Sequence, residues 1–451
     1  MKLIKKLTSL VCAAAMLSAA QPAMPAIQTQ AAATTPQQIL DRMGIGWNLG
    51  NSLDVPASGS SSETLWGNPK TTRELIEFVH DQGFSSIRIP VSWGHHMNNT
   101  THKIDASYMA RVKEVVDYAY EDGMYVIINI HHDNDIRSGS SNFFYPSSTY
   151  KSQSETFVKA VWSQVSETFK DYDQHLIFET LNEPRLAGTS DEWWFPVNNP
   201  NSNVKTAVSI INTLNQDAVD VIRASGGNNK TRLIMCPGYG ASLDGAIVSG
   251  FKLPTDASGM VGVSIHAYVP YNYAMNTGDG AVSSYNDDMK KELASIFSTI
   301  KSKVKDKGMA CYIGEFGATN KGNDTERCKW SEDYTKQAKA LGIPVLLWDN
   351  NAYNVGAENF GLIDRTNLVV KYKSYLTSLM KAYPKAAHTP GDADESGEID
   401  VSDVLMIQQY TAGWNVAINL ENADVDGDGS ADISDALLIQ QKIAGWNVEL
   451  K

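Results

Sequence analysis

Two glutamates stand where their carboxyl groups could work together as acid and nucleophile. Glu183 follows a short apolar run in Thr180-Leu-Asn-Glu-Pro, and Glu315 closes a second run in Ile313-Gly-Glu-Phe-Gly. Cleavage of a glycosidic bond needs one carboxylic acid to protonate the leaving oxygen and a second carboxylate as nucleophile or base. Either glutamate alone would be read as a surface or ion-paired residue. The pair predicts this chemistry if the fold brings both to one cleft.

Further polar and aromatic side chains occupy the same kind of position, the end of an apolar run. They are Asn48, Arg88, His131, His132, the segment 179–183, His266, Glu315 and Trp348. Parallel strands of a closed barrel place their carboxyl ends on one rim, where the chemistry of such barrels takes place. A random set of strand ends would seldom combine so many polar and aromatic groups.

Eight short β-branched or apolar runs are the strands expected to position these residues. They cover 45–49, 86–89, 125–130, 176–180, 232–236, 261–266, 310–315 and 344–348. Helical patterns such as 71–82, 109–121 and 154–170 lie between them. This alternation predicts an α/β chain with a (β/α)8 barrel. A doubly wound open sheet is the alternative, but no glycine-rich phosphate turn follows any of the strands.

Six motifs, in the correct order, resemble the signature of glycoside hydrolase family 5. They are Arg88-Ile-Pro, His131-His-Asp, Asn182-Glu-Pro, His266-Ala-Tyr268, Glu315-Phe-Gly and Trp348. The resemblance covers residues 37–383. Segments beginning at Gly46, Trp66 and Phe360 resemble the branch of that family rich in endo-β-1,4-glucanases. That branch also contains enzymes that act on xyloglucan and mixed-linkage glucan.

The resemblance implies a retaining mechanism without a catalytic cofactor, with Glu183 as acid/base and Glu315 as nucleophile. The two carboxyl groups should then lie roughly 5–5.5 Å apart. Arg88 would hold Glu315 ionised, and Tyr268 would donate a hydrogen bond to the same carboxylate. Asn182 would contact the 2-hydroxyl of the sugar, where hydrogen bonds strengthen in the transition state.

The remaining residues of the expected cleft have supporting roles. His131 would orient the substrate, His266 would orient the acid/base, and Trp348 would stack on a sugar face. His132, Asn48 and Trp66 complete the set. Other tryptophans could line further sugar positions or belong to the core; they are Trp47, Trp93, Trp193 and Trp194. Three loop histidines without a metal-ligand spacing are expected to be solvated: His95, His96 and His102.

The C-terminal 61 residues contain an internal repeat, since Ile407-Gln-Gln recurs as Ile439-Gln-Gln, 32 residues later. Each copy has oxygen ligands at positions 1, 3, 5, 7, 9 and 12 of a loop, with glycine at position 6. Calcium takes six to eight such oxygens, the seventh position giving a backbone carbonyl. The expected ligands are Asp392, Asp394, Ser396, Glu398, Asp400 and Asp403, then Asp424, Asp426, Asp428, Ser430, Asp432 and Asp435.

These repeats resemble a type I-like dockerin, a small all-α module of paired calcium loop–helix repeats. Position 12 is Asp where an ordinary EF-hand has Glu, and only a following helix is present. The resemblance covers residues 391–450 and implies a cohesin module of a scaffold protein as partner. Ser396 departs from the usual Asp or Asn, which predicts weaker calcium binding by the first loop. Matched residues at positions 10 and 11, Val401-Ser402 and Ile433-Ser434, predict binding in two orientations.

The first 33 residues have the order of a secretory signal peptide, with basic residues, then an apolar run, then small residues. We expect cleavage near Ala33 and a secreted, extracellular protein. The predicted domains are the signal peptide 1–33, the barrel 34–383, a linker 384–390 and the dockerin 391–451. Cys236 and Cys311 end apolar runs, so they are expected to be buried free thiols.

Charge is placed unevenly. The dockerin region has 13 acidic and two basic residues and so carries −11 of the net charge of −13. No basic patch indicates nucleic acid, and neither nucleic acid nor membrane is an expected partner. The leading interpretation is a retaining endo-β-1,4-glucanase carried on a scaffold. Three alternatives stay open: xyloglucan, lichenan or mannan as the main substrate, a non-catalytic carbohydrate-binding barrel, and a calcium-regulated sensor.

Overall fold

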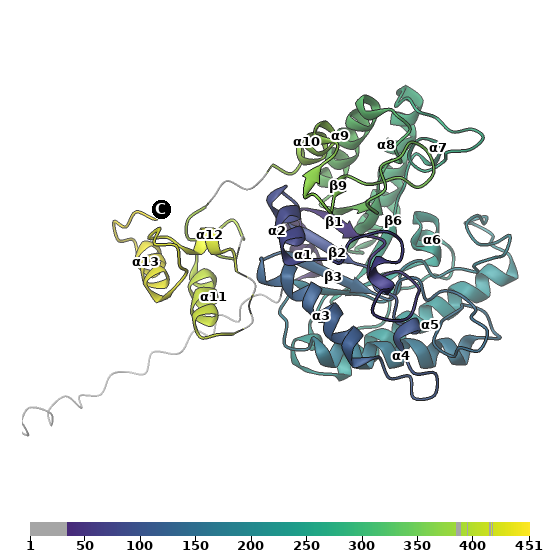
Figure 1. Ribbon diagram of the computed structural model, residues 1–451, viewed down its shortest axis with the longest axis horizontal. Coiled ribbons are helices and arrows are strands. Elements are labelled where there is room, and N and C mark those ends of the chain that lie inside the picture. Colours follow the sequence, from purple (N-terminus) through teal and green to yellow (C-terminus); the bar gives the residue numbers. More distant parts are fainter. Residues whose placement is uncertain (1–33, 385–388, 395, 415, 417) are drawn as a thin grey trace, which may run out of the picture. The chain divides into compact units, whose positions relative to one another are not determined.

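The structure is a computed structural model that describes residues 34–384, 389–394, 396–414, 416 and 418–451 (Figure 1). The predicted signal peptide lies outside these residues, as does the middle of the predicted linker. Among the helices of the described residues, none is both long and apolar enough to cross a membrane.

Eight parallel strands close into a barrel, each paired with the next in the chain and the last paired with the first. They are β1 (Ile45–Leu49), β2 (Ser86–Ile89), β3 (Tyr125–Asn129), β4 (Leu176–Glu179), β5 (Ile234–Pro237), β6 (Val261–His266), β7 (Cys311–Phe316) and β8 (Val345–Asp349). The predicted (β/α)8 fold is therefore confirmed, and every predicted strand is present within two residues of its expected bounds.

Helices surround the strands (Figure 1). In chain order they are α1 (Pro36–Arg42), α2 (Arg73–Asp81), α3 (Ala106–Glu121), α4 (Lys151–Thr168), α5 (Ser202–Ala224), α6 (Leu243–Ile247), α7 (Tyr271–Ala274), α8 (Asp287–Lys303), α9 (Asp324–Ala340) and α10 (Lys373–Met380). A two-stranded antiparallel ribbon, β9 (Ile363–Asp364) with β10 (Val369–Val370), follows β8.

Helix α3 begins three residues before its predicted start. The side chain of Asp105 accepts a hydrogen bond from the Ser107 amide at 2.8 Å, and so caps the helix. An aspartate in this position satisfies an amide that otherwise has no partner within the helix. Helix α2 begins in the same way at Thr72, whose hydroxyl accepts from the Leu75 amide at 3.3 Å.

Helix α1 contributes to an apolar cluster inside the strands. Ile39, Leu40 and Met43 are buried in this cluster with strand residues such as Ile127 and Leu346. Full burial of one such side chain stabilises a fold by roughly 1.5–3 kcal/mol. Because apolar side chains fill this part of the barrel, the polar side chains lie at the carboxyl ends of the strands.

The C-terminal residues form a small helical unit with α11 (Val401–Thr411), α12 (Leu420–Ala423) and α13 (Ile433–Ile443). Its apolar cluster is drawn only from residues between 393 and 450. Each long helix follows one acidic loop and starts with a capping box, Asp400 with Asp403 and Asp432 with Asp435. The predicted paired loop–helix architecture is confirmed.

Two of the smaller predictions have opposite outcomes. Cys236 and Cys311 are buried free thiols, as predicted. The prediction that the loop histidines are solvated is wrong for His96, which is buried and whose ring stacks on Tyr108 with centroids 3.5 Å apart. His102 is half-buried, and its Nδ1 lies 2.7 Å from the side-chain oxygen of Asn142. These two rings help to pack the long loops that follow the strands. The sequence around them does not indicate this role.

Candidate active site

The barrel strands bring the predicted site residues to their carboxyl ends. Asn48 of β1 is the register partner of Arg88 in β2 and of Trp348 in β8. His266 of β6 is the register partner of Glu315 in β7. Glu183 follows β4 by four residues. Residues from six strands or their ends therefore meet at one rim, although 132 residues separate the two glutamates.

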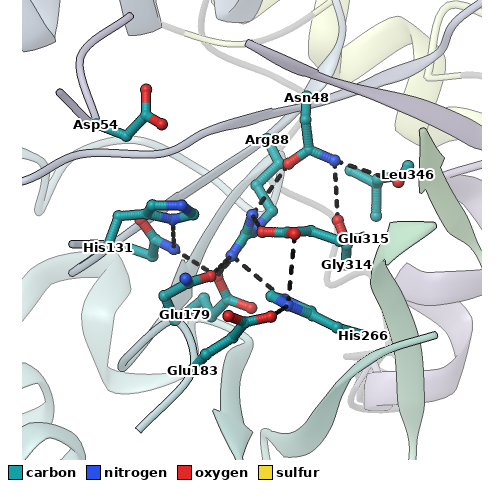
Figure 2. A network of polar contacts seen from close by, with 12 residues as sticks. Asn48, Asp54, Arg88, His131, Glu179, Glu183, His266, Gly314, Glu315 and Leu346 are labelled. Carbon is teal, nitrogen blue, oxygen red and sulfur yellow. Dashed lines mark hydrogen bonds and ion pairs between the residues drawn. The ribbon is translucent and has the colours of Figure 1, made fainter. Parts of the chain in front are cut away.

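Arg88 lies at the centre of the site and is completely buried (Figure 2). Its Nη1 donates to Glu315 Oε1 at 2.7 Å and to Asn48 Oδ1 at 3.0 Å. Its Nε donates to Glu179 Oε2 at 2.8 Å, and Nη2 donates to Asn182 Oδ1 at 2.7 Å. Burial alone would lower the pKa of the guanidinium, but Glu179 and Glu315 outweigh burial and raise it. Arg88 is thus a permanent cation shared by two carboxylates.

Both oxygens of Glu315 have donors. Arg88 binds Oε1, and the Tyr268 hydroxyl donates to Oε2 at 2.8 Å. Burial and the charge of Glu315 raise the pKa of Tyr268 well above its ordinary value, so the phenol stays protonated and remains a donor. These two donors fix the orientation of the Glu315 carboxylate, and a fixed orientation favours nucleophilic attack.

Glu183 is paired with His266. The ring Nδ1 of His266 lies 2.8 Å from Glu183 Oε1 and 3.6 Å from Glu315 Oε2. Burial would raise the pKa of Glu183, but the hydrogen bond and charge of His266, followed by the charge of Arg185, lower it. For His266, burial would lower the pKa, but Glu315 and Glu183 raise it. Each group therefore favours the charged form of the other across this hydrogen bond.

The separation of the two glutamates distinguishes between mechanisms. One carboxylate oxygen of Glu183, one of Glu315 and a ring nitrogen of His266 all lie within 4.8 Å of one another. Retaining glycosidases hold their carboxyl groups ~5–5.5 Å apart, whereas inverting enzymes leave room for a water at ~6.5–9.5 Å. The geometry fits the retaining arrangement.

A second group of rings lies beside these carboxylates. The rings of His131 and Trp348 are parallel within 2°, with centroids 5.9 Å apart. Trp348 is only 8% exposed, so it presents little more than one edge or face to a ligand. The ring centroids of His132 and Trp66 lie 5.8 Å apart, and Trp66 is 47% exposed. Asp54, 3.6 Å from His132, raises the pKa of His132 against the opposing effect of burial.

Two of the tryptophans considered for sugar positions belong to the core. Trp47 is fully buried, and its Nε1 donates to Asp349 Oδ2 at 3.0 Å. Trp93 is also buried, and its Nε1 donates to the carbonyl oxygen of Asn129 at 2.8 Å. Neither can stack on a sugar. Trp193 and Trp194 are exposed.

The motifs did not single out Glu179, which the structure places beneath the site. Its carboxylate is fully buried and accepts from Arg88, from Asn129 at 2.9 Å, from Tyr312 at 2.8 Å and from Ser264. A glutamate inside an apolar strand such as Leu176-Ile-Phe-Glu is itself a signal, because a buried carboxylate must be paired. Arg185, which contacts Glu183 Oε2 at 3.5 Å, had no comparable signal.

Each of the two acidic loops brings three carboxylates together. Oxygens of Asp392, Asp394 and Asp403 lie within 4.8 Å of one another, as do those of Asp424, Asp426 and Asp435. Burial, with the charges of Asp394 and Asp392, raises the pKa of Asp403 to about 6. Crowded carboxylates of this kind fit a hard divalent cation.

The other predicted ligands of the loops make hydrogen bonds within the loops and to the helices that follow them. Asp400 and Asp432 cap the helices that follow, and each accepts an amide hydrogen bond at 2.6 Å, from Ser402 and Ser434 respectively. Ser396 Oγ lies 3.5 Å from Asp392 Oδ1 and donates to the Glu398 carbonyl at 3.1 Å. In the second loop, the Asp428 carboxylate accepts from the Ser430 amide at 2.9 Å.

Comparison with known families agrees with this arrangement. The model of the cellulase family, glycosyl hydrolase family 5, matches residues 51–354, and that of the dockerin type I domain matches residues 390–444. Endoglucanase A of Ruminococcus albus is 42% identical over 333 residues, which are 73% of this chain and 87% of that protein.

Two solved structures show the same likeness in three dimensions. A family 5 lichenase of Caldicellulosiruptor sp. F32, in complex with cellotetraose, has a TM-score of 0.73 at 39% identity, over 77% of this chain and 95% of that one. A broad-specificity endoglucanase of Ruminococcus flavefaciens has a TM-score of 0.71 at 42% identity, over 78% and 99% respectively. With its closed barrel and its paired rim glutamates, the chain belongs to glycosyl hydrolase family 5 and carries a type I dockerin domain.

Proposed function

We propose that the barrel hydrolyses internal β-1,4-glucosidic bonds of cellulose-type glycans by double displacement. The observation that carries this proposal is the pairing of Glu183 and Glu315, with carboxylate oxygens within 4.8 Å of one another. Glu183 is the acid/base and Glu315 the nucleophile. Asn48, Arg88, Asn182, His266 and Tyr268 position the two carboxylates, while His131, His132, Trp66 and Trp348 face the sugar.

In the first step, Glu315 attacks the anomeric carbon and the bond to the leaving oxygen breaks. Glu183 gives a proton to that oxygen, and the proton comes from the pair that Glu183 forms with His266 across 2.8 Å. In the second step, Glu183 takes a proton from a water, which attacks the anomeric carbon and releases Glu315. Asn182, fixed by Arg88 through its side-chain oxygen, has its amide hydrogens for the sugar 2-hydroxyl.

Loop shape decides which β-glycan is cleaved fastest. Relatives of this chain are described as a lichenase and as a broad-specificity endoglucanase. These descriptions support a β-1,4-glucan substrate for this chain, with xyloglucan or lichenan as the alternative main substrates. Mannan is the third alternative, and no similar protein named above supports it.

The C-terminal module attaches the enzyme to a cohesin of a scaffold protein outside the cell. Residues 1–33 are the secretion signal, 34–383 the catalytic barrel, 384–390 a linker and 391–451 the dockerin. Calcium, held by Asp392, Asp394 and Asp403 and by Asp424, Asp426 and Asp435, would neutralise the crowded carboxylates and so stabilise the loops.

The test is release of reducing sugar by the full chain from carboxymethylcellulose, xyloglucan, lichenan and mannan. Glu183→Gln and Glu315→Gln should each lower kcat by roughly 100-fold or more. Glu167→Gln, at an exposed position of α4, should leave it unchanged. A folded wild-type protein inactive on all four glycans would contradict the proposal and favour a barrel that only binds carbohydrate.

A further inference from the structure

The two glutamates of the proposed mechanism are held in the fold in different ways. Glu315 belongs to β7 itself, and Arg88 and Tyr268 bind its carboxylate. Glu183, in contrast, follows the last residue of β4 by four positions and lies beyond the paired residues of the barrel. An acid/base must still come within hydrogen-bond reach of the leaving oxygen. The position of Glu183 therefore depends on the contacts of the segment that carries it.

A buried asparagine in the loop after β3 binds this segment. The side-chain oxygen of Asn134 accepts from the Arg185 amide at 3.1 Å, and its nitrogen donates to the Arg185 carbonyl at 3.0 Å. These two bonds imitate the contact of a neighbouring strand, and together they fix which way the amide of Asn134 faces. Because Arg185 is only two residues beyond Glu183, Asn134 holds the backbone next to the acid/base.

The loop after β5 holds the same segment. The Gly240 amide donates to the Pro184 carbonyl at 2.8 Å. The Tyr239 hydroxyl accepts from the Leu186 amide at 3.0 Å and donates to the Asp191 carbonyl at 2.6 Å. Tyr239 is buried, and burial raises the pKa of its hydroxyl to about 12, so the hydroxyl stays protonated and remains a donor. Since β3 and β5 are the two neighbours of β4, residues 184–186 are held from both adjacent loops.

Both supporting loops are themselves anchored. In the loop after β3, the fully buried carboxylate of Asp133 accepts from the amides of Trp93 and Gly94 at 2.8 and 2.9 Å. In the loop after β5, a Cβ on Gly245 would lie 1.9 Å from the Tyr239 carbonyl oxygen, so this close approach requires glycine. A support that is fixed in this way can in turn fix the position of the residue that it binds.

The side chain of Glu183 makes its contacts from this held segment. Its Oε1 lies 2.8 Å from the His266 ring, and its Oε2 lies 3.5 Å from the Arg185 guanidinium. Arg185 also donates to the Glu183 carbonyl at 3.0 Å. A displacement of about 1 Å at a reacting group can lower a rate roughly 100-fold. A shift of residues 184–186 would therefore be felt in the transfer of a proton to and from Glu183.

We propose that Asn134 and Tyr239 are positioning residues for the acid/base, and that they act on the reaction through the backbone of residues 184–186. The proposal rests on the proposed function, in which Glu183 is the acid/base and Glu315 the nucleophile. The bonds of the Asn134 amide and the Tyr239 hydroxyl run to the loop after β4, whereas Arg88 and Tyr268 hold Glu315. Loss of either residue should thus impair protonation of the leaving group and leave the attack by Glu315 intact.

Two aryl cellobiosides separate these two parts of the reaction. Phenolate is a strong enough base to need a proton as it leaves phenyl β-cellobioside, whereas 2,4-dinitrophenolate leaves without one. Neither substrate places a sugar on the departing side, so a change in contacts to a departing sugar does not affect the comparison. On the dinitrophenyl substrate, kcat/KM reports the attack by Glu315, and kcat reports the later step in which Glu183 takes a proton from water.

In Asn134→Ala and Tyr239→Phe of the full chain, kcat/KM on phenyl β-cellobioside should fall about tenfold. On the dinitrophenyl substrate, kcat/KM should stay within about twofold of wild type, while kcat and KM should fall together. Glu183→Gln should show the same separation more strongly. Asn229→Ala is the matched control, because it removes a buried amide that donates to the Ser166 carbonyl at 2.8 Å, ahead of β5. This control should lower kcat/KM on neither substrate.

Equal losses of kcat/KM on the two aryl substrates would overturn the proposal, because they would show a general disturbance of the site. An unchanged kcat/KM on phenyl β-cellobioside would also overturn it. Tyr239→Phe removes a single oxygen atom and keeps the test open if Asn134→Ala does not fold. If Glu183→Gln failed to separate the two substrates, the acid/base assignment of the proposed function would be wrong instead.

Discussion

Arg88 connects the stability of the barrel with the arrangement of the candidate site. It neutralises two buried carboxylates, Glu179 and Glu315, and binds the side-chain oxygens of Asn48 and Asn182. Arg88→Met would leave both carboxylates unpaired in the barrel, so we expect a loss of roughly 3–5 kcal/mol in the free energy of unfolding. Activity should fall below detection. Denaturant unfolding and reducing-sugar release measure the two effects.

Arg88→Lys is the informative comparison. Lysine keeps the charge but lacks the planar fork that reaches four partners at once. This variant should recover most of the stability while activity stays low. Equal stability of Arg88→Met and the wild type would show that the buried ion pairs do not hold the barrel together.

The tautomer of His131 is set by Asn129. The Asn129 side-chain oxygen accepts from the Val91 amide at 3.1 Å, so its nitrogen faces His131 Nδ1 at 3.1 Å. Nδ1 must therefore accept, and the hydrogen lies on Nε2. Burial, followed by the charges of His132 and Arg88, lowers the pKa of His131 well below its ordinary value, which keeps the ring neutral. Asn129→Ala should release the tautomer and lower kcat/KM by roughly tenfold to 100-fold.

The measurement for Asn129→Ala is kcat/KM beside the nitrogen NMR shifts of the His131 ring. The wild-type spectrum should show protonated Nε2 alone, and the variant a mixture. A spectrum with protonated Nδ1 in the wild type would refute the assignment. Asn142→Ala, at a buried loop asparagine that donates to the Met97 carbonyl at 3.0 Å, serves as the control for a lost buried amide.

The Glu183–His266 pair predicts the pH dependence of kcat/KM. The pair must hold one proton. His266 has a raised pKa, so the proton is lost on the alkaline side only above the ordinary histidine range. The alkaline limb should therefore lie above the ordinary histidine range, and it belongs to the pair rather than to either residue.

His266→Asn tests this assignment. Without the imidazole, Glu183 alone carries the proton, and the alkaline limb should move to lower pH. The profile is measured as kcat/KM on a soluble glucan from about pH 4 to about pH 9. An alkaline limb that stays in place would assign it to another group.

At the scale of the elements, the hydrophobic pattern of the sequence was sufficient to predict the eight strands and the polar residues at their ends. Each strand run was short and apolar, and its last residues were polar because they face the cleft. The alternation of side-chain directions along a strand could also have predicted that Trp47 belongs to the core. Asn48 points into the barrel, where it donates to the Gly314 carbonyl at 2.9 Å, so its neighbour must point to the helix layer.

Other features of the site depended on contacts that no local pattern reveals. Arg185 contacts Glu183 and Trp193 only because the loop after β4 folds back on itself, tied by Glu192. His96 is buried because Tyr108 of α3 supplies a stacking partner. Long loops after strands carry specificity, and their conformations depend on neighbours far away in the sequence.

The whole molecule has two kinds of stability. The barrel clusters are apolar and buried among residues up to 383, whereas the small C-terminal cluster uses residues from 393 onward. Each acidic loop crowds three carboxylates, so we expect the C-terminal module to need a divalent cation for its stability, whereas the barrel has a large apolar core of its own. Chelation should therefore melt α11 and α13 and leave the barrel folded. Calorimetry of the full chain should show one transition that moves to lower temperature with chelator and one that does not.

Activity on a soluble glucan separates this expectation from calcium regulation. With chelator present, reducing-sugar release should stay within about twofold of the untreated enzyme, because the Arg88–Glu315–Glu183 site shares no residue with the acidic loops. Cohesin capture, in contrast, should be lost. Asp435→Asn reproduces the effect on one loop without chelator, since Asp435 both joins its carboxylate cluster and closes the capping box of α13. A parallel loss of activity and capture would make the C-terminal module a calcium sensor for the barrel, because only coupling between the modules could transmit the change.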